Sequence, residues 1–314
     1  MAKLRFIDNI KGLQAVQLLR FITFLIISIV FTKSHLTRAE IGKWELFLFI
    51  ASLLSFFWVS GIIQSLLTLY HRNKTFRSRG EAAERKSPEI FNAFLLILFF
   101  SFLVFALGIP IKNALPSIGI KQDVPYLGLL LWYILLSNPV TLIEYIYLLN
   151  NRSHRILQYG LYTYGAQILL VLAPVIAGYD EKSAIYGLFI ITGVRWIWLI
   201  ILLRRYTLIK VSFDFIREQL YVGMPLVLTF LISGSAQYID GIIISACYED
   251  PGVFAMFRYG AKEFPLVFLL ATGLSNALLP QFSTREGMRE ALVTLRSKSE
   301  KLMHLLFPLS IVTM

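Results

Sequence analysis

Residues 39–67, AEIGKWELFLFIASLLSFFWVSGIIQSLL, have a counterpart later in the same chain. The counterpart is EDPGVFAMFRYGAKEFPLVFLLATGLSNALL, residues 249–279. Each segment begins with an acidic residue two positions before a glycine, Gly42 or Gly252, and has an aromatic residue two positions after it. Each ends on a similar apolar stretch, SGIIQSLL in the first and TGLSNALL in the second. A repeat over this distance indicates a chain built from two related halves.

The rest of the chain is as apolar as these two segments. Hydrophobic residues make up 57% of the 314 residues and charged residues 16%, and the mean hydropathy is +0.67. A helix needs roughly 20 apolar residues to cross a bilayer core of about 30 Å. Eight runs of about this length lie between short charged connectors: 14–32, 46–69, 90–111, 126–149, 156–178, 184–203, 220–247 and 253–282. Eight such runs leave too little polar surface for a soluble fold, so the pattern predicts an all-α integral membrane protein.

The two counterpart segments cover the second and the eighth of these spans. Because an offset of six spans is even, both copies cross the bilayer in the same direction, which implies a pseudo-two-fold axis along the membrane normal. We therefore predict an N-terminal lobe of six helices at 1–203 and a partial C-terminal lobe at 220–314. The connector at 204–219, RRYTLIKVSFDFIREQ, mixes aromatic, apolar and basic residues, which predicts an amphipathic helix on the cytoplasmic face.

The last apolar run is shorter than the others. It begins at Leu302 and reaches the end of the sequence at Met314, so it has only 13 residues. A helix of that length covers roughly 20 Å, less than the bilayer core. We therefore expect about eight complete spans and a truncated ninth, in a fragment of a longer protein; a short re-entrant or interfacial helix is the alternative for this last run.

Lys and Arg are unevenly distributed between the two sides of the membrane. Of the 30 basic residues, 21 lie in the N-terminal segment and in alternate connectors, six lie in the other connectors, and three lie within spans. This bias predicts a multi-pass protein of the cell (inner, cytoplasmic) membrane with its N-terminus in the cytoplasm. An anionic inner leaflet attracts such cations, so the net charge of +11 does not indicate a nucleic-acid partner.

Neither the cysteine nor the histidines form a pattern typical of a metal or cofactor site. The single cysteine, Cys247, cannot close an intrachain disulfide. The four histidines lie in or near different connectors, without ligand spacing. We predict no metal site, no cofactor and no catalytic residue.

Six charged residues fall within the predicted spans: Glu144, Arg195, Asp240, Arg258, Lys262 and Glu263. Charged groups at membrane depth are expected to pair with one another or to face a wet cavity. With three bases and three acids, complete pairing into ion pairs that lock helices together is one interpretation. Under this ion-pair interpretation, Asp240 on the seventh span and Glu144 on the fourth span serve as partners of the bases. Asp240 is a candidate partner for either base of the eighth span.

The other interpretation is an anion-binding surface on the eighth span. Arg258 and Lys262 are four residues apart, so they share one face of a helix, whereas Glu263 lies round the helix from Arg258. The counterpart stretch in the second span, ELFLFIASLLSFF at 45–57, has no basic residue. The basic face therefore belongs to one half of the repeat. Arg20, at the start of the first span, is counted with the N-terminal segment. Its two interpretations are that it lines the cytoplasmic entrance or, as we expect, that it reaches the head groups by snorkelling.

Three stretches carry a resemblance to a known family. They are the acidic-x-Gly pair that opens an even-numbered span, YVGMPLVLTFLISGSAQYID at 221–240, and DPGVFAMFRYGAKEFPL at 250–266. With these, the chain resembles the polysaccharide-transport, or O-antigen flippase, branch of the multidrug/oligosaccharidyl-lipid/polysaccharide (MOP) exporter superfamily. The resemblance implies a two-lobe MOP/MATE-like helical bundle.

The resemblance also implies a function and a substrate. Such proteins turn an undecaprenyl diphosphate carrying a short glycan from the cytoplasmic to the outer leaflet, by alternating access of the two lobes. A diphosphate carries about two negative charges and favours Arg or Lys in a wet cavity. Arg258, Lys262 and Arg195 are therefore expected to contact this lipid-linked oligosaccharide. Asp240, Glu144 and Glu263 are expected to serve in ion pairs or in coupling. Membrane lipids and other polysaccharide-assembly proteins are the further partners expected.

Three other functions stay open at this point. A small-cation or drug antiporter of the same superfamily would want a net acidic cavity, which the basic face of the eighth span argues against. A membrane enzyme of glycan assembly, such as a polymerase or a glycosyltransferase, would need a sizeable outer loop with catalytic carboxylates, and the outer connectors here are short. A scaffold that binds glycan-assembly partners without transport is the third.

Overall fold

The computed structural model describes residues 2–77, 87–114 and 124–260, with a few short pieces between 292 and 304. The main helices are α1 (Ala2–Lys33), α2 (Arg38–Leu53), α3 (Phe56–Arg77), α4 (Pro88–Ala114), α5 (Leu127–Val140), α6 (Leu142–Leu149), α7 (Ser153–Ile176), α8 (Glu181–Tyr206), α9 (Phe213–Cys247) and α10 (Pro251–Gly260). Within the described ranges, the only pairing outside helices is an isolated bridge between Ser87 and Thr207. The predicted all-α class is confirmed.

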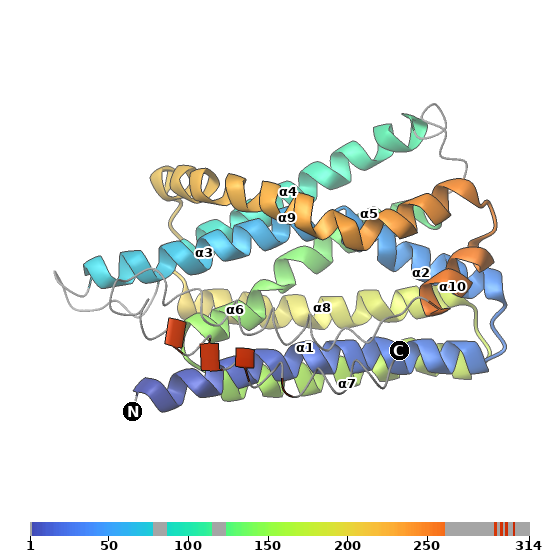
Figure 1. Ribbon diagram of the computed structural model, residues 1–314, viewed down its shortest axis with the longest axis horizontal. Helices are drawn as coiled ribbons and strands as arrows, with labels where there is room; N and C mark the ends of the chain where they lie inside the picture. Colours follow the sequence, from blue (N-terminus) through green and yellow to red (C-terminus); the bar gives the residue numbers. More distant parts are fainter. Residues whose placement is uncertain are drawn as a thin grey trace.

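The helices run along the long axis of the molecule (Figure 1). The start of α1, the end of α3 and the start of α9 lie at one end, which we call the N-terminal end. The turns between α1 and α2 and between α9 and α10 lie at the opposite end. Each helix that runs the length of the long axis therefore takes the chain from one end of the molecule to the other.

The described helices account for seven of the eight predicted spans. Six helices are long and apolar enough to cross a membrane, and the bent pair α2 and α3 makes a seventh. The eighth predicted span begins in α10, and its residues beyond Gly260 lie outside the described residues. The run that begins at Leu302 also lies outside them.

The second span starts earlier than predicted and is broken in the middle. Thr37 and Glu40 form a capping box, in which each side chain accepts a hydrogen bond from the backbone N–H of the other residue. The helix therefore begins at Arg38, and Glu45, predicted to end the connector, is instead buried inside α2. The span then bends by 44° between α2 and α3.

The connector between the two predicted lobes differs from its prediction. Residues 207–212 are not helical, so the amphipathic helix predicted for 204–219 is wrong over this stretch. Asn92, fully buried at the start of α4, accepts a hydrogen bond from the N–H of Ser212 and donates one to the carbonyl of Lys210. Ser87 also donates a backbone hydrogen bond to Tyr206. These bonds satisfy backbone groups of a non-helical connector, which a surface helix would have satisfied by itself.

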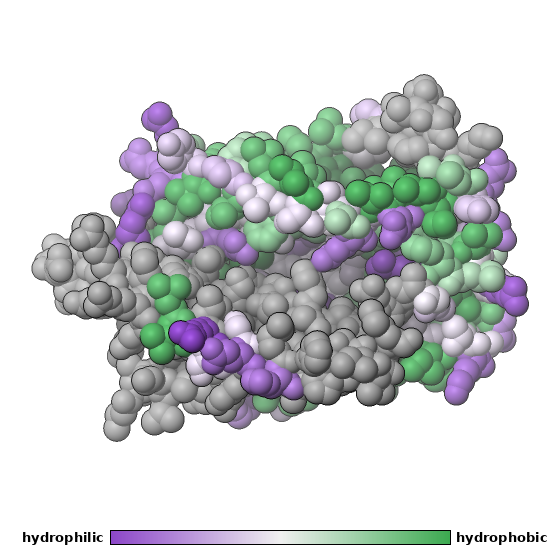
Figure 2. Space-filling model, viewed as in Figure 1, coloured by the Kyte–Doolittle hydropathy of each residue, from purple (hydrophilic) through white to green (hydrophobic). Residues whose placement is uncertain are grey.

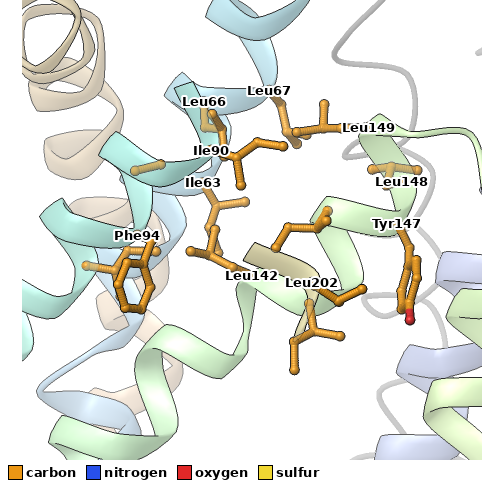
Figure 3. Close-up of a cluster of buried hydrophobic side chains, with 14 of the residues drawn as sticks. Ile63, Leu66, Leu67, Ile90, Phe94, Leu142, Tyr147, Leu148, Leu149 and Leu202 are labelled. Carbon is orange, nitrogen blue, oxygen red and sulfur yellow. The ribbon is translucent and has the colours of Figure 1, made fainter. Parts of the chain in front are cut away.

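Apolar side chains from several helices, α1 and α3 to α9, fill the bundle towards the N-terminal end. Figure 3 shows Leu66 of α3, Phe94 of α4, Leu142 of α6 and Leu202 of α8 pointing into one buried cluster. The surface is also rich in apolar side chains: Phe99, Phe102, Leu169, Ile190, Ile197 and Ile201 are all exposed. In Figure 2, hydrophilic side chains gather at the two ends of the molecule, and the stretch between them is mainly hydrophobic with some hydrophilic side chains near its centre. This distribution fits a surface in contact with lipid.

Candidate functional site

Two groups of charged and polar side chains lie within the membrane-spanning helices. The first, here called the arginine cluster, comprises Arg20 of α1, Glu144 of α6, Tyr164 and Gln167 of α7, and Arg195 of α8. The second lies where α2 and α3 pack against α9 and α10, a contact here called the seam. The seam cluster comprises Glu45 and Phe49 of α2, Tyr238 of α9, and Arg258 and Tyr259 of α10.

Arg20 and Glu144 form a closely packed ion pair in the arginine cluster. Arg20 Nη2 donates to Glu144 Oε1 at 2.6 Å, and Arg20 Nε donates to the Tyr164 hydroxyl, also at 2.6 Å. The Tyr164 hydroxyl donates in turn to Glu144 Oε1 at 3.2 Å. The three groups satisfy one another in a closed triangle. The prediction that Arg20 snorkels to the head groups is therefore wrong.

Arg195 has a different environment from Arg20. Its Nη2 donates to Gln167 Oε1 at 2.8 Å, and its guanidinium lies 5.0 Å from the centre of the Tyr164 ring. Its Nε is buried and has no hydrogen-bond partner among the residues that the structure describes. Within the described part of the chain, Arg195 forms no ion pair with a carboxylate. The arginine cluster thus holds two guanidinium groups and one carboxylate.

The helices that carry this cluster meet at small residues. A Cβ atom on Gly160 of α7 would come within 2.7 Å of Val16 of α1, so the two helices approach closely one turn before Tyr164 and Arg20. Gln17 lies one turn before Arg20 on α1, is 8% exposed, and has a buried Oε1 without a partner. A polar stripe therefore continues along α1 from the ion pair towards the N-terminal end.

In the seam cluster, Arg258 pairs with Glu45. The distance from Arg258 Nε to Glu45 Oε2 is 3.9 Å, and the Arg258 guanidinium lies 5.8 Å from the centre of the Phe49 ring. The Tyr259 hydroxyl interacts with the side chains of Glu45 and Ser28. The next turns of the seam are aromatic, with the rings of Phe49 and Tyr238 5.8 Å apart. The two counterpart segments, which include α2 and α10, thus both contribute side chains to the polar contact of Glu45 with Arg258 and Tyr259.

Asp240 does not take the position proposed for it as a partner of Arg258. Its side chain is exposed on α9 and forms no ion pair with any residue in the described ranges, so its role stays a prediction. Lys262 and Glu263 lie outside the described residues. Glu45 is the residue that sequence reasoning missed. The capping box that begins at Thr37 was the available signal, because it places Glu45 two turns inside a helix.

The glycines that opened the two counterpart segments meet at the seam. A Cβ atom on Gly42 would lie 1.9 Å from the carbonyl oxygen of Pro251, so only a glycine allows α2 and α10 to pack this closely. A Cβ atom on Gly252 would lie 3.3 Å from Cβ of Arg38. Equivalent positions of the repeat thus face each other across one helix crossing, as expected near a pseudo-two-fold axis.

Neither cluster lines either of two surface pockets. One pocket, of about 620 Å³, lies between the starts of α4 and α9, and another, of about 730 Å³, lies beside α5 at the opposite end. Among the described residues, no group of three or more His, Cys, Asp and Glu side chains is arranged to hold a metal ion. The polar chemistry at membrane depth is therefore that of guanidinium groups, carboxylates and tyrosine hydroxyls.

Solved structures of transporters share the fold. No family model and no curated protein sequence matches the chain. An outward-facing multidrug resistance MATE family transporter of the MOP superfamily aligns with a TM-score of 0.66 and 14% identity, covering 96% of this chain and 71% of that one. The MATE transporter ClbM, in complex with Rb⁺, aligns with a TM-score of 0.65 and 18% identity over 98% and 71% of the two chains.

A further structure is a MOP superfamily transporter from Pyrococcus furiosus, described as having a binding pocket of reverse polarity that suggests a different function. It aligns with a TM-score of 0.58 and 13% identity, over 96% of this chain and 70% of that one. At these identities the matches show the fold alone. They confirm the predicted two-lobe MOP/MATE-like helical bundle.

Proposed function

We propose that this chain moves a lipid-linked oligosaccharide, carried on undecaprenyl diphosphate, across the cytoplasmic membrane by alternating access. Two observations support a transporter: the fold is shared with MATE and MOP transporters, and the repeat segments meet at the seam. The choice of substrate rests on the residues at membrane depth. The Pyrococcus furiosus neighbour illustrates that one fold serves pockets of different polarity, so the substrate has to be argued from this chain's own side chains.

The environment of Arg195 is the main support for an anionic substrate. In the ion-pair interpretation every base within the spans has an acid as its partner. Glu144 pairs with Arg20, whereas the polar and ring contacts of Arg195 among the described residues are with the neutral Gln167 and the Tyr164 ring. A guanidinium with a buried, unpartnered Nε is costly at membrane depth unless an anion or water reaches it. A diphosphate supplies that anion.

The test is export of surface polysaccharide by the full-length protein in living cells. Arg195→Gln is expected to lower export about tenfold or more, because it removes the charge that the diphosphate would meet in a desolvated site. Arg195→Lys keeps the charge and is expected to keep part of the export. Arg204→Gln is the matched control, because Arg204 lies on the same helix and is exposed near its end.

Membrane abundance of each variant has to be measured alongside export. Full export by Arg195→Gln at normal abundance would contradict the proposal. Accumulation of the lipid-linked glycan on the inner leaflet in that variant separates a transport defect from a defect in glycan synthesis, which distinguishes a flippase from an enzyme of glycan assembly.

A second candidate is a small-molecule or cation antiporter. It is favoured by Asp240, an exposed carboxylate on a membrane-spanning helix without an ion-pair partner among the described residues, and by neighbours named as MATE transporters. This candidate predicts efflux of a cationic dye that Asp240→Asn abolishes and Arg195→Gln leaves unchanged. The flippase proposal predicts the reverse dependence for polysaccharide export.

A further inference from the structure

Glu45 is a buried carboxylate whose neighbours lie across the seam. It is 7% exposed, in the second turn of α2, and both Arg258 and Tyr259, which interact with it, belong to α10. A buried carboxylate is costly unless a cation and hydrogen-bond donors compensate its charge. The compensation for Glu45 therefore depends on α2 and α10 lying together at this end of the molecule.

Arg258 is held loosely by this contact. Its distance to Glu45 is 3.9 Å, against 2.6 Å for the Arg20–Glu144 pair, and its side chain is 41% exposed. The contact uses Nε, and the two terminal nitrogens of Arg258 have no hydrogen-bond or ion-pair partner within the described part of the chain. The paired donors at the open end of a guanidinium fit the oxygens of a phosphate group.

We propose that Glu45 is a built-in competitor of the transported anion. Its carboxylate occupies Arg258 while the site is empty, and a phosphate group of the substrate displaces it. The inference rests on the proposed function, in which Arg258 contacts the diphosphate. A phosphate group with several oxygens and more negative charge competes well against one carboxylate at 3.9 Å.

The exchange couples anion binding to separation of the helices. The Glu45–Arg258 contact exists only while α2 and α10 are packed at the Gly42–Pro251 crossing. An anion that takes Arg258 removes this contact, so it favours the state in which the two helices are apart. By linkage, separation of the helices favours binding of the anion to the same degree. Glu45 therefore makes opening at this end depend on a loaded site.

Binding of inorganic pyrophosphate to the purified full-length protein, measured by titration calorimetry, tests the competition. Glu45→Gln removes the competing charge and keeps the shape, so it is expected to bind pyrophosphate about fivefold tighter or more. Arg258→Gln is expected to bind it more weakly. In the Arg258→Gln background, adding Glu45→Gln is expected to leave the affinity for pyrophosphate unchanged, because the guanidinium for which Glu45 and pyrophosphate compete is absent. Glu249→Gln, which removes an exposed carboxylate at the same end, is the control and is expected to bind as the unmodified protein does.

Each contrary result has a distinct meaning. Unchanged or weaker binding by Glu45→Gln overturns the inference, since a residue that merely positions Arg258 would act in that direction. Equal tightening in both backgrounds overturns it too, because that is a long-range charge effect. Unchanged binding by Arg258→Gln overturns the role of Arg258, whereas the export test on Arg195 decides the proposed function separately.

A distance measurement keeps the inference testable if Glu45→Gln folds poorly. Spin labels at Lys33→Cys, at the end of α1, and Met256→Cys, exposed on α10, report separation at this end in a Cys247→Ser background. Pyrophosphate is expected to lengthen this distance when Glu45 is present. Glu45→Asp, whose shorter carboxylate lies further from Arg258, is expected to lengthen it without pyrophosphate. An unchanged distance in both experiments contradicts the coupling.

Discussion

Two of the arginine–glutamate pairs in the described part of the chain, Arg20–Glu144 and Arg258–Glu45, use the same side chains in opposite ways. In the arginine cluster, Glu144 lies 2.6 Å from Arg20, and Tyr164 completes the contact. At the seam, Glu45 lies 3.9 Å from Arg258. Both carboxylates are buried, at 4% and 7% exposed, so burial does not distinguish them. The difference is that the first pair joins helices of one predicted lobe, and the second joins helices of the two predicted lobes.

Backbone packing, by contrast, is equally close in the two regions. A Cβ atom on Gly187 of α8 would lie 2.2 Å from the carbonyl oxygen of Leu170 in α7. At the seam, the corresponding distance from Gly42 to the carbonyl of Pro251 is 1.9 Å. At the end where α2 meets α10, the seam is therefore a fully packed contact with a loosely held charge pair, whereas Arg72 of α3 and Glu218 of α9 form a close ion pair at its other end. Such a combination suits a surface that has to close tightly and to open again.

The largest effect is expected from breaking the tight pair. Glu144→Gln removes the charge that balances Arg20 and is expected to lower the stability of the protein by about 2 to 3 kcal/mol. The full cost of breaking a buried pair is reduced here because the Arg20 side chain is 42% exposed. The measurement is the apparent melting temperature of the detergent-solubilised protein, with Glu249→Gln as the control. A melting temperature equal to that of the control would contradict the structural role of the pair.

Two glycine substitutions separate packing inside a lobe from packing across the seam. Gly187→Ala is expected to lower the melting temperature, at a cost of about 1 to 3 kcal/mol, because the new methyl group meets a backbone carbonyl. Gly42→Ala makes a similar clash, but α2 and α10 can relieve it by moving apart. It is therefore expected to lower stability less than Gly187→Ala and to lengthen the distance between labels at Lys33 and Met256.

Gly193→Ala is the matched control for both, because a Cβ atom there meets nothing within 4 Å. It is expected to leave the melting temperature unchanged or raised, since alanine favours a helix more than glycine does. Equal losses of stability for Gly42→Ala and Gly187→Ala would show that the seam does not open more readily than the interior of a lobe.

The membrane-spanning architecture could be predicted because it depends on local sequence. Twenty apolar residues are enough to indicate a span, and seven of the eight predicted spans have counterparts among the described helices. The partners of the charged residues could not be predicted in the same way. Glu144 is 124 positions from its partner Arg20, and nothing near either residue identifies the other.

The other differences have the same origin. Residues 207–212 contain the mixture typical of an amphipathic helix, yet they are not helical, and Asn92, 120 positions before Ser212, bonds to their backbone at Lys210 and Ser212. Asp240 was the acid expected at the seam because it lies within a predicted span. Glu45 was overlooked because the predicted span began one residue after it. Hydrogen bonds between distant residues and helix caps determine the structure of 207–212 and the partner of Arg258. A hydropathy pattern indicates neither.

A smaller effect is expected from a neutral polar contact inside the predicted N-terminal lobe. Asn138 of α5 donates to Ser55, at the break between α2 and α3, at 3.1 Å, and to Ser101 of α4 at 3.4 Å. Asn138→Leu is expected to cost about 0.5 to 1.5 kcal/mol, since both hydroxyls are able to bond to their own helix backbone instead. The melting temperature relative to Ser137→Ala, at the neighbouring position of the same helix, measures it. A loss as large as that of Glu144→Gln would mean that the break in the second span depends on this contact.

The smallest effect on stability is expected from Glu45→Gln, the counterpart of Glu144→Gln at the seam. The pair is long and its arginine is partly exposed, so its loss is expected to cost less than about 1 kcal/mol. Tyr259 can still bond to the amide that replaces the carboxylate. The melting temperature should therefore stay close to that of Glu249→Gln, while the distance between Lys33 and Met256 labels increases. A large loss of stability would place Glu45 in the same class as Glu144, as a pair that holds helices together, and would remove the reason to treat the seam as the part of the molecule that opens.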